Sequence, residues 1–445
     1  MNRFPGRDVA AGLPGASLFV AAMIWLLIIF NIVPEGFDYG SPGYMPTQGS
    51  AVSRLIWIFL LSTGFLVVLW RAALSLLLIR AINPFFLAFL VLAIASAAWS
   101  IDPGVTIRRL VRLLAIFSCA CGFILVGWHN RRFQNVIRPV LTVMLLGSLV
   151  FGIVAPNLAI PVATQAELVG AWRGLSTQKN GFGSLASLGT IFWLHALFTR
   201  EVRPVVAIAG AASAATCLYL SRSSTSLLAT GCAVLILMLL VYSPRGMQRS
   251  LPAIIGLAAA ALLVYSLAVL QIVPGLQLLL EPITAITGKD MSFTGRTDLW
   301  ALIRERISQH PYLGGGFGSY WVGEVPSSQS YEFIARLNFY PGQAHNGYLD
   351  VINDLGFLGG VLLVGYLIAY LWQSLRLREL DRNQGTLYLA LVFQQLVSNL
   401  SESRWWNVLS VEFVILTLAT AALARDLLEN RVRAIVAAGQ HSNQS

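Results

Sequence analysis

Residues 275–355 hold two polar islands, Thr294-Gly295-Arg296-Thr297-Asp298-Leu299-Trp300 and His345-Asn346-Gly347-Tyr348-Leu349-Asp350. The chain around them is almost entirely apolar: of its 445 residues, 56% are hydrophobic and only 11% are charged. A soluble protein of this length would carry about 25% charged residues. We therefore predict an all-α protein that crosses a membrane many times, with residues 275–355 as a large loop outside the bilayer.

The apolar runs predict the transmembrane helices. A span needs about 17–25 mostly apolar residues, and on this criterion we place about twelve helices near 16–33, 52–70, 84–99, 105–127, 137–154, 181–198, 204–220, 224–241, 251–273, 351–372, 385–400 and 406–424. Small residues fill the run 204–220, as expected of a helix packed tightly in the interior of a bundle. The predicted organisation is an N-terminal bundle of about nine helices (1–273), a loop (274–350), about three further helices (351–424) and a tail (425–445).

Arginine sets the predicted orientation. The net charge is +10, and almost all the positive charge is arginine, since Lys179 and Lys289 are the only lysines. Alternate loops are rich in arginine, which is typical of loops that remain in the cytoplasm. Both termini are then cytoplasmic, while 34–50, 155–180 and the large loop face outward, which is the periplasm if the source is a Gram-negative bacterium. The arginine-rich loops and tail contain Arg3, Arg7, Arg71, Arg80, Arg131, Arg132, Arg138, Arg200, Arg203, Arg245, Arg249, Arg376, Arg378, Arg382, Arg425, Arg431 and Arg433.

Arg173, Arg222 and Arg296 lie in the outward turns and depart from this pattern. A charged side chain at the membrane is costly unless it is paired or lines a cavity. Guanidinium groups bind phosphate through two parallel hydrogen bonds, so we interpret these arginines, with Lys179, as a clamp for a pyrophosphate. Taken singly, such an arginine is as often a surface residue that extends to the membrane interface. Asn180 follows where the loop re-enters the membrane, and it could cap the next helix.

Within the large loop, residues 297–308 predict a short amphipathic helix with Leu299 and Ile303 on its apolar face. This helix is too short to span, so we expect it to rest on the bilayer surface. The glycines of 314–318 lack the Lys-Ser/Thr of a nucleotide site, and we interpret them as a flexible turn. No His, Cys or Asp spacing indicates a metal site, and we expect no cofactor and no nucleic-acid partner.

His345 is the strongest candidate for a catalytic base, because it lies where the large loop returns to the membrane. Histidine accepts a proton near neutral pH, although a lone histidine at an interface is usually a hydrogen-bonded structural residue. Asn346, Asp350, Asn353 and Asp354 follow it at helical spacing and form one polar stripe, which indicates a wet cavity within the bundle.

The segment 399–407 makes another outward turn. Glu402 and Arg404 either pair with each other or contact sugar hydroxyls. Trp405 and Trp406 either stack on a sugar or anchor the turn at the membrane interface, and base rates favour the anchor. The residues that we expect near the substrate are therefore Asn180, Asn346, Tyr348, Asp350, Glu402 and Arg404.

Taken in order, these motifs resemble the bacterial O-antigen ligase/O-antigen polymerase superfamily, and within it they look most like the exopolysaccharide polymerases. One departure is that Gln178-Lys179-Asn180 stands where relatives often have His-Lys-Asn. The matching stretches are Trp99-Ser100-Ile101-Asp102-Pro103, Arg173-Gly174, Lys179-Asn180, Ser221-Arg222-Ser223, Thr294 to Trp300, the glycine turn Gly314 to Gly318, and Ala344-His345-Asn346-Gly347-Tyr348-Leu349.

The resemblance implies a GT-C-type glycosyltransferase whose donor is a glycan on undecaprenyl pyrophosphate. Arginines that match Arg173, Arg222 and Arg296 engage the pyrophosphate, and a histidine that matches His345 activates the acceptor hydroxyl. The reaction is expected to be independent of metal and inverting. The implied location is the inner membrane, with the active site facing the periplasm, and the implied partners are the lipid-linked oligosaccharide, the acceptor glycan, membrane lipids, and chain-length regulator and export proteins.

Three classes of function compete on this sequence. A polymerase extends a repeat-unit glycan on its own lipid carrier, whereas a ligase moves the finished glycan to lipid A-core. Both use the same donor chemistry, so the arginines do not separate them. A transporter or flippase for lipid-linked sugars would carry charges at the bilayer midplane and show paired halves, which this sequence does not.

Overall fold

The structure, a computed structural model, describes residues 14–34, 36–40, 50–128, 133–161, 169–270, 275, 296–323, 326–338 and 340–442. Over these residues the chain is helical or in turns and loops, and no strand occurs. The first part contains α2 (Pro14–Ile32), α3 (Ala51–Trp70), α4 (Ala72–Ala81), α5 (Pro84–Ala95), η1 (Ser96–Ala98), α6 (Pro103–Val126), α7 (Gln134–Val154), α8 (Pro156–Ala159), α9 (Lys179–Phe198), α10 (Pro204–Leu220), α11 (Ser224–Tyr242), η3 (Arg245–Met247) and α12 (Leu251–Val269). The second part contains α14 (Arg296–Gln309), η5 (Gln329–Tyr331), α15 (Glu332–Leu337), α16 (Gly347–Leu380), α17 (Arg382–Ser398) and α18 (Val411–Ser442).

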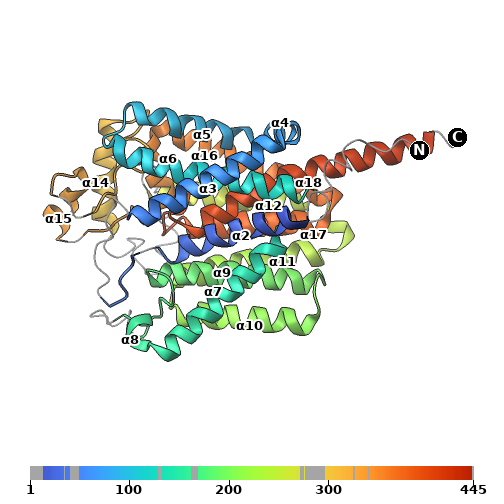
Figure 1. The fold of residues 1–445 in the computed structure, drawn as a ribbon, viewed down its shortest axis with the longest axis horizontal. Helices are drawn as coiled ribbons and strands as arrows, with labels where there is room; N and C mark the ends of the chain where they lie inside the picture. The colour runs from blue at the N-terminus through green and yellow to red at the C-terminus, as the bar shows by residue number, and fades with distance from the viewer. Residues whose placement is uncertain are drawn as a thin grey trace.

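The apolar runs do form helices, and most of the long helices run roughly along one axis (Figure 1). Each predicted span range falls on a helix in the part of the chain that the structure describes. Seven of these helices are long and apolar enough to cross a membrane, or eight if α4 and α5, bent by 104° at their junction, form one span. The all-α, multi-pass membrane architecture is therefore confirmed, while the total of about twelve spans stays a prediction.

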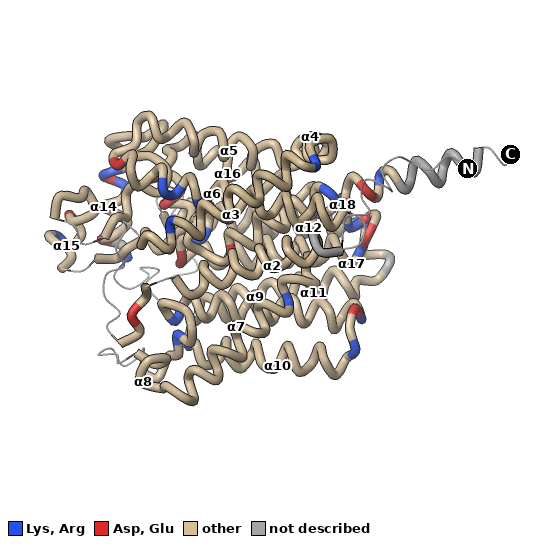
Figure 2. Tube along the Cα trace, viewed as in Figure 1, with Lys and Arg blue, Asp and Glu red and all other residues tan. Residues whose placement is uncertain are grey.

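Arginines occur at both ends of the bundle (Figure 2). At one end Arg138 pairs with Glu201 at 3.0 Å, and Arg382 donates hydrogen bonds to the carbonyls of Leu240 and Val241. These residues belong to the arginine-rich set. The opposite end carries α8, α14 and α15 (Figures 1 and 2). The orientation of the chain in the membrane, which was inferred from arginine content, stays a prediction.

Helix α10 lies at the edge of the bundle, so the interior position predicted for 204–220 is wrong (Figure 1). Some of its small residues face α9, where a Cβ added at Gly210 would lie 2.3 Å from the indole ring of Trp193, while Ala209, Ala212 and Ala215 are exposed. On its other face Val205 and Tyr219 are largely exposed. Close packing against α9 requires a small residue at Gly210.

Helix α16 is broken at Gly356, whose φ of 65° is outside the helical region. The break frees the carbonyls of Asn353 and Asp354, which accept hydrogen bonds from the N–H groups of Gly315 (3.0 Å) and Gly316 (2.9 Å). The backbone approaches so closely here that a Cβ added at Gly356 would lie 2.2 Å from the carbonyl carbon of Tyr312. The glycine turn 314–318 is thus a tightly bonded part of the bundle, and the prediction that it is flexible is wrong.

Helix α14 confirms the predicted amphipathic helix in the large loop. Leu299, Trp300 and Ile303 are almost completely buried, and the indole N–H of Trp300 donates a 2.9 Å hydrogen bond to the carbonyl of Ala344. The apolar face therefore packs against the protein beside the start of α16, and not on the bilayer surface as predicted. Helix α14 is in contact with α16, which therefore supplies part of the covering surface.

Candidate functional site

The turn between α17 and α18 is held in shape by Asn399. The Asn399 side-chain oxygen accepts hydrogen bonds from the backbone N–H groups of Arg404 (2.8 Å) and Trp405 (2.7 Å). Its carbonyl accepts from the N–H of Gly347, and a Cβ added at Gly347 would lie 1.9 Å from the Asn399 side-chain oxygen. This turn is therefore fixed against Gly347, the first residue of α16. Gly347 directly follows Asn346, which the sequence predicted to lie near the substrate.

Asn346 has a structural role at the same junction. Its side-chain oxygen accepts hydrogen bonds from the N–H groups of Tyr348 and Leu349 and so caps α16. Its amide donates to the carbonyl of Leu400. Tyr348 is buried, and its hydroxyl donates to the carbonyl of Leu396. These contacts position His345, which directly precedes the cap.

Glu402 is the centre of a polar cluster. Its carboxylate accepts a 2.6 Å hydrogen bond from the amide of Asn180 and a 3.0 Å hydrogen bond from the amide of Gln343. It also lies 3.7 Å from Nδ1 of His345 and 3.5 Å from Arg404. Buried polar groups of this kind are stable only when their hydrogen bonds are satisfied, as they are here.

The charge state of Glu402 follows from its neighbours. Burial alone raises the pKa of this carboxyl group, because the charged form loses its hydration. Contact with His345 and the positive charges of Arg404 and Arg296 outweigh burial and lower the pKa to about 2. Glu402 is therefore ionised at neutral pH and provides a fixed negative charge beside His345.

His345 is held in a left-handed backbone conformation, with a φ of 50°. Non-glycine residues adopt this conformation at a cost, and such residues gather at functional sites. Nδ1 of His345 lies 3.1 Å from the amide nitrogen of Gln343, so Gln343 bridges the imidazole and Glu402. The imidazole is 23% exposed, whereas the Glu402 side chain is 2% exposed. The ring is thus fixed on its Nδ1 side and accessible elsewhere.

Two further predicted residues join this cluster. Arg296, at the start of α14, donates a 2.9 Å hydrogen bond to the carbonyl of Ser401, next to Glu402. Asn180 does not cap α9 as predicted, because its side chain reaches across to Glu402; the capping position is Gln178, which makes no side-chain cap bond. Lys179 is the first residue of α9 and is partly buried.

Arg404 does pair with Glu402, one of the two alternatives that the sequence left open. It also lies 3.3 Å from Glu412 in α18. Burial alone would lower the pKa of Arg404, but the negative charges of Glu412 and Glu402 raise it above the usual arginine value. The Glu412–Arg404–Glu402 series therefore ties the turn to α18.

Arg173 and Arg222 come from two neighbouring turns, which are joined by a 2.9 Å hydrogen bond from the N–H of Trp172 to the carbonyl of Leu220 and form a second group. Arg173 is buried, and its guanidinium donates hydrogen bonds to the carbonyls of Leu158 and Tyr39. Arg222 is exposed, has a φ of 49°, and donates a 2.6 Å hydrogen bond to the carbonyl of Val169. The second group is connected to the first through Thr225, whose hydroxyl lies 2.6 Å from the hydroxyl of Ser401.

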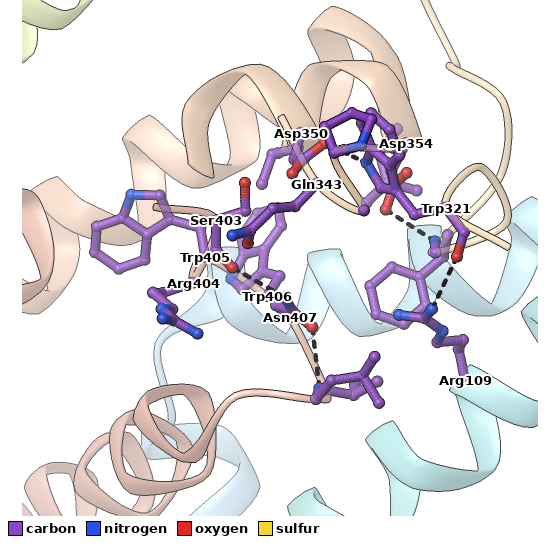
Figure 3. Close-up of a pocket in the computed structure, with 18 of the residues that line it drawn as sticks. Arg109, Trp321, Gln343, Asp350, Asp354, Ser403, Arg404, Trp405, Trp406 and Asn407 are labelled. Carbon is purple, nitrogen blue, oxygen red and sulfur yellow. Dashed lines mark hydrogen bonds between the residues drawn. The ribbon is translucent and has the colours of Figure 1, made fainter. Parts of the chain in front are cut away.

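A cavity of about 240 Å³ lies beside the cluster (Figure 3). Trp405 and Trp406 line it and are both 3% exposed. Trp406 stacks on Phe89 with ring centroids 3.8 Å apart. Because both indoles are packed inside the protein, the prediction that they anchor the turn at the membrane interface is wrong. The cavity is lined by Arg109, Thr177, Gln178, Phe317, Gly318, Trp321, Pro341, Gly342, Gln343, Asp350, Val351, Asp354, Leu355, Ser403, Arg404, Trp405, Trp406, Asn407, Val408 and Leu409.

Sequence reasoning placed Asp350 near the substrate, and it does line this cavity. Both of its carboxyl oxygens accept hydrogen bonds, one from the indole of Trp321 (2.7 Å) and one from the N–H of Ala344 (2.9 Å). Gln343, Trp321 and Arg109 were missed. Arg109 stands out in the sequence as a charge inside an apolar run, but Gln343 and Trp321 carry no signal that a single sequence would reveal.

Two comparisons with known proteins bear on this site. Residues 209–364 match the protein family described as O-antigen ligase, a region that includes Arg222, Arg296 and His345. Over 322 residues the chain is 29% identical to the exopolysaccharide production protein ExoQ of Rhizobium meliloti (strain 1021). The matched region covers 68% of this chain and 68% of the relative. Together with the multi-pass helical fold and the site around His345, these similarities support the placement of this chain in the O-antigen ligase/polymerase family.

Proposed function

We propose that this protein is a glycosyltransferase that moves a glycan from undecaprenyl pyrophosphate to a sugar hydroxyl at the periplasmic face of the inner membrane. The product would be a surface polysaccharide or exopolysaccharide built from repeat units. The observation that carries the proposal is the bridged pair of His345 and Glu402 beside Arg296, at one end of a membrane bundle. The topology proposed with it has both termini in the cytoplasm.

His345 would act as the general base. For Nε2 to accept the proton of the acceptor hydroxyl, the neutral ring must carry its own proton on Nδ1, which lies 3.7 Å from the Glu402 carboxylate. The hydroxyl oxygen then forms a bond to the anomeric carbon of the donor glycan, and the bond from that carbon to the pyrophosphate oxygen breaks. Attack from the face opposite the leaving group inverts the anomeric configuration. Glu402 stabilises the imidazolium that forms, because it is ionised and lies 3.7 Å from the ring.

The lipid pyrophosphate leaves with the bonding electron pair. Its negative charge is stabilised by nearby positive side chains, so it does not have to be protonated to leave. Arg296 lies beside the His345 cluster, and Arg222 and Lys179 are accessible at the same end of the bundle. Arg173 is bonded to backbone carbonyls, so its contribution would come through a rearrangement or through its net charge. Electrostatic stabilisation of developing charge is usually the largest single contribution to such reactions. No step requires a metal ion in this scheme.

The leading alternative is a ligase that transfers the glycan to lipid A-core. The name of the relative, an exopolysaccharide production protein, favours the polymerase. The second alternative, a transporter or flippase for lipid-linked sugars, is disfavoured because Glu402, Arg296 and His345 cluster where helices begin and end, not midway along spans. Chain-length regulator and export proteins are the proposed partners of the polymerase.

Reconstitution separates these functions. The full chain in liposomes would receive lipid-linked repeat units alone, or together with lipid A-core. A polymerase makes a ladder of products from the repeat units alone, whereas a ligase needs lipid A-core and a flippase makes neither product. His345→Ala and Arg296→Ala should abolish the ladder, and Trp372→Phe, on an exposed part of α16, should not. Full-length polymer from properly inserted His345→Ala protein would refute the proposed mechanism.

A further inference from the structure

The cavity beside His345 has features of a sugar-binding site that the proposed mechanism does not use. We propose that it binds one uncharged sugar residue of the acceptor glycan, with Asp354, Trp406 and Arg109 as the groups that contact its hydroxyls. This inference rests on the proposed function, since it names the acceptor that the reaction would require. Its evidence is the arrangement of polar groups around the cavity (Figure 3).

Asp354 has a carboxyl group of which only one oxygen is hydrogen-bonded within the described part of the chain. One oxygen accepts a 2.8 Å hydrogen bond from the N–H of Gly318, which fixes the side chain. The other oxygen is shielded from solvent and has no hydrogen-bond partner among the described residues. Buried polar atoms are rarely left unpaired, and such an atom on a cavity wall indicates a group that a ligand or ordered water satisfies.

Trp406 adds an unpaired donor on the same cavity. Its side chain is 3% exposed, and its indole N–H has no hydrogen-bond partner within the described part of the chain. Its ring cannot turn away freely, because it stacks on Phe89 at 3.8 Å. An acceptor and a donor held in fixed positions suit a sugar, whose hydroxyl groups both donate and accept hydrogen bonds.

Trp321 and Arg109 complete the wall. The indole of Trp321 is fixed by its 2.7 Å hydrogen bond to Asp350. Arg109 donates to the carbonyl of Trp321 at 3.3 Å through one nitrogen of its guanidinium, and it interacts electrostatically with Asp354. A sugar ring has an apolar face and hydroxyl groups at its edge. The rigid indole of Trp321 can pack against that face, and the charged groups beside it can form hydrogen bonds with the hydroxyls.

The charges around the cavity favour an uncharged sugar. Asp350 and Asp354 both line it, while Arg109 interacts electrostatically with Asp354 and Arg404 is already paired with Glu402 and Glu412. A sugar acid would place a third carboxyl group beside the two aspartates, and like charges at close range disfavour each other. A neutral hexose adds no charge.

The size and position of the cavity fit one acceptor residue. Its volume of about 240 Å³ is below the roughly 300–1,000 Å³ of pockets for drug-sized ligands, so it suits a single ring better than a whole repeat unit. Gln343 lines the cavity and also contacts Nδ1 of His345. A sugar in the cavity is therefore adjacent to the proposed base.

The test is direct binding to the purified full chain in detergent, without any donor. Methyl glucoside and methyl galactoside would be titrated by saturation-transfer NMR and compared with methyl glucuronide. We expect saturable binding of at least one neutral glycoside in the millimolar range, and binding of the glucuronide that is at least ten-fold weaker. Asp354→Asn should weaken neutral binding about ten-fold or more, because an amide NH2 replaces the unpaired oxygen that would accept from the sugar, while the amide oxygen can still accept from Gly318.

Three further variants make the outcome decisive. Trp406→Phe removes the indole N–H and keeps an aromatic ring on Phe89, so it should weaken binding several-fold, whereas Trp372→Phe should leave binding unchanged. His345→Ala should bind the glycoside normally although it makes no polymer, which separates this proposal from the proposed function. Absence of saturable binding, equal binding by folded Asp354→Asn protein, or a preference for the glucuronide would overturn the proposal.

Discussion

Asn180 and Glu402 lie 222 positions apart in the chain, yet the amide of Asn180 donates a 2.6 Å hydrogen bond to the Glu402 carboxylate. This bond joins the start of α9 to the turn between α17 and α18. It therefore brings the Lys179-Asn180 motif to the residue that lies beside His345.

Replacement of Asn180 tests the junction directly. Asn180→Asp would place a second carboxylate against Glu402, so we expect at least a ten-fold loss of transfer activity and a lower thermal unfolding temperature. Asn180→Ala should be milder, since it removes one hydrogen bond without adding charge. Asn157→Asp is the matched control, because Asn157 is exposed in α8 at the same end of the bundle. Equal activity of Asn180→Asp and the control would contradict the role of this contact.

Glu402 should make the stability of the protein depend on acid pH. Its pKa in the folded protein is about 2, below the value of about 4.3 for an unperturbed glutamate. A lowered pKa contributes stability that is fully present above the unfolded pKa and is lost as the pH falls toward the folded pKa. Between pH 5 and pH 3, the unfolding temperature of the wild type should therefore fall more steeply than that of Glu402→Gln. Parallel curves for the two proteins would show that Glu402 has an ordinary pKa.

The glycines at the break of α16 should resist substitution. Gly356→Ala would bring a Cβ to 2.2 Å from the Tyr312 carbonyl carbon, and the positive φ of Gly356 adds strain. We expect poor insertion or an unfolding temperature lower by several degrees, measured by the yield and thermal unfolding of detergent-purified protein. Gly256→Ala in α12 is the control, because a Cβ there meets nothing within 4 Å. A normal yield and stability for Gly356→Ala would mean that the turn 311–316 can move aside.

Substitutions of Arg173 and Arg222 should have different effects on stability and on donor binding. Arg173 is buried against backbone carbonyls, so Arg173→Ala should lower thermal stability as well as activity, because it leaves those carbonyls unpaired. Arg222 is exposed, and Arg222→Ala should raise the KM for the lipid-linked donor while the unfolding temperature stays the same. Steady-state assays with varied donor, together with unfolding curves, check both. An unchanged donor KM for Arg222→Ala would remove Arg222 from the proposed clamp.

Much of the architecture could be predicted from residue order alone. Apolar runs identify helices because the bilayer satisfies only backbones that bond internally. The arginine content sorts the loops into two sets, and the spacing of Leu299 and Ile303 predicts α14. Catalytic chemistry made His345 the candidate base, since few other side chains exchange protons near neutral pH. These features depend on local composition and helical periodicity, which a single sequence records.

Only the tertiary structure determines what surrounds His345. Packing of α9, α16 and the α17–α18 turn brings Asn180, Gln343 and Glu402 together, and no local pattern encodes contacts between such distant residues. The same packing buries Trp406, which composition had suggested was an interface anchor. It also converts a glycine-rich turn into a rigid partner of the broken α16. Sequence determines which segments are helical and which side chains are charged, whereas the cavity and its hydrogen bonds arise from how the helices pack.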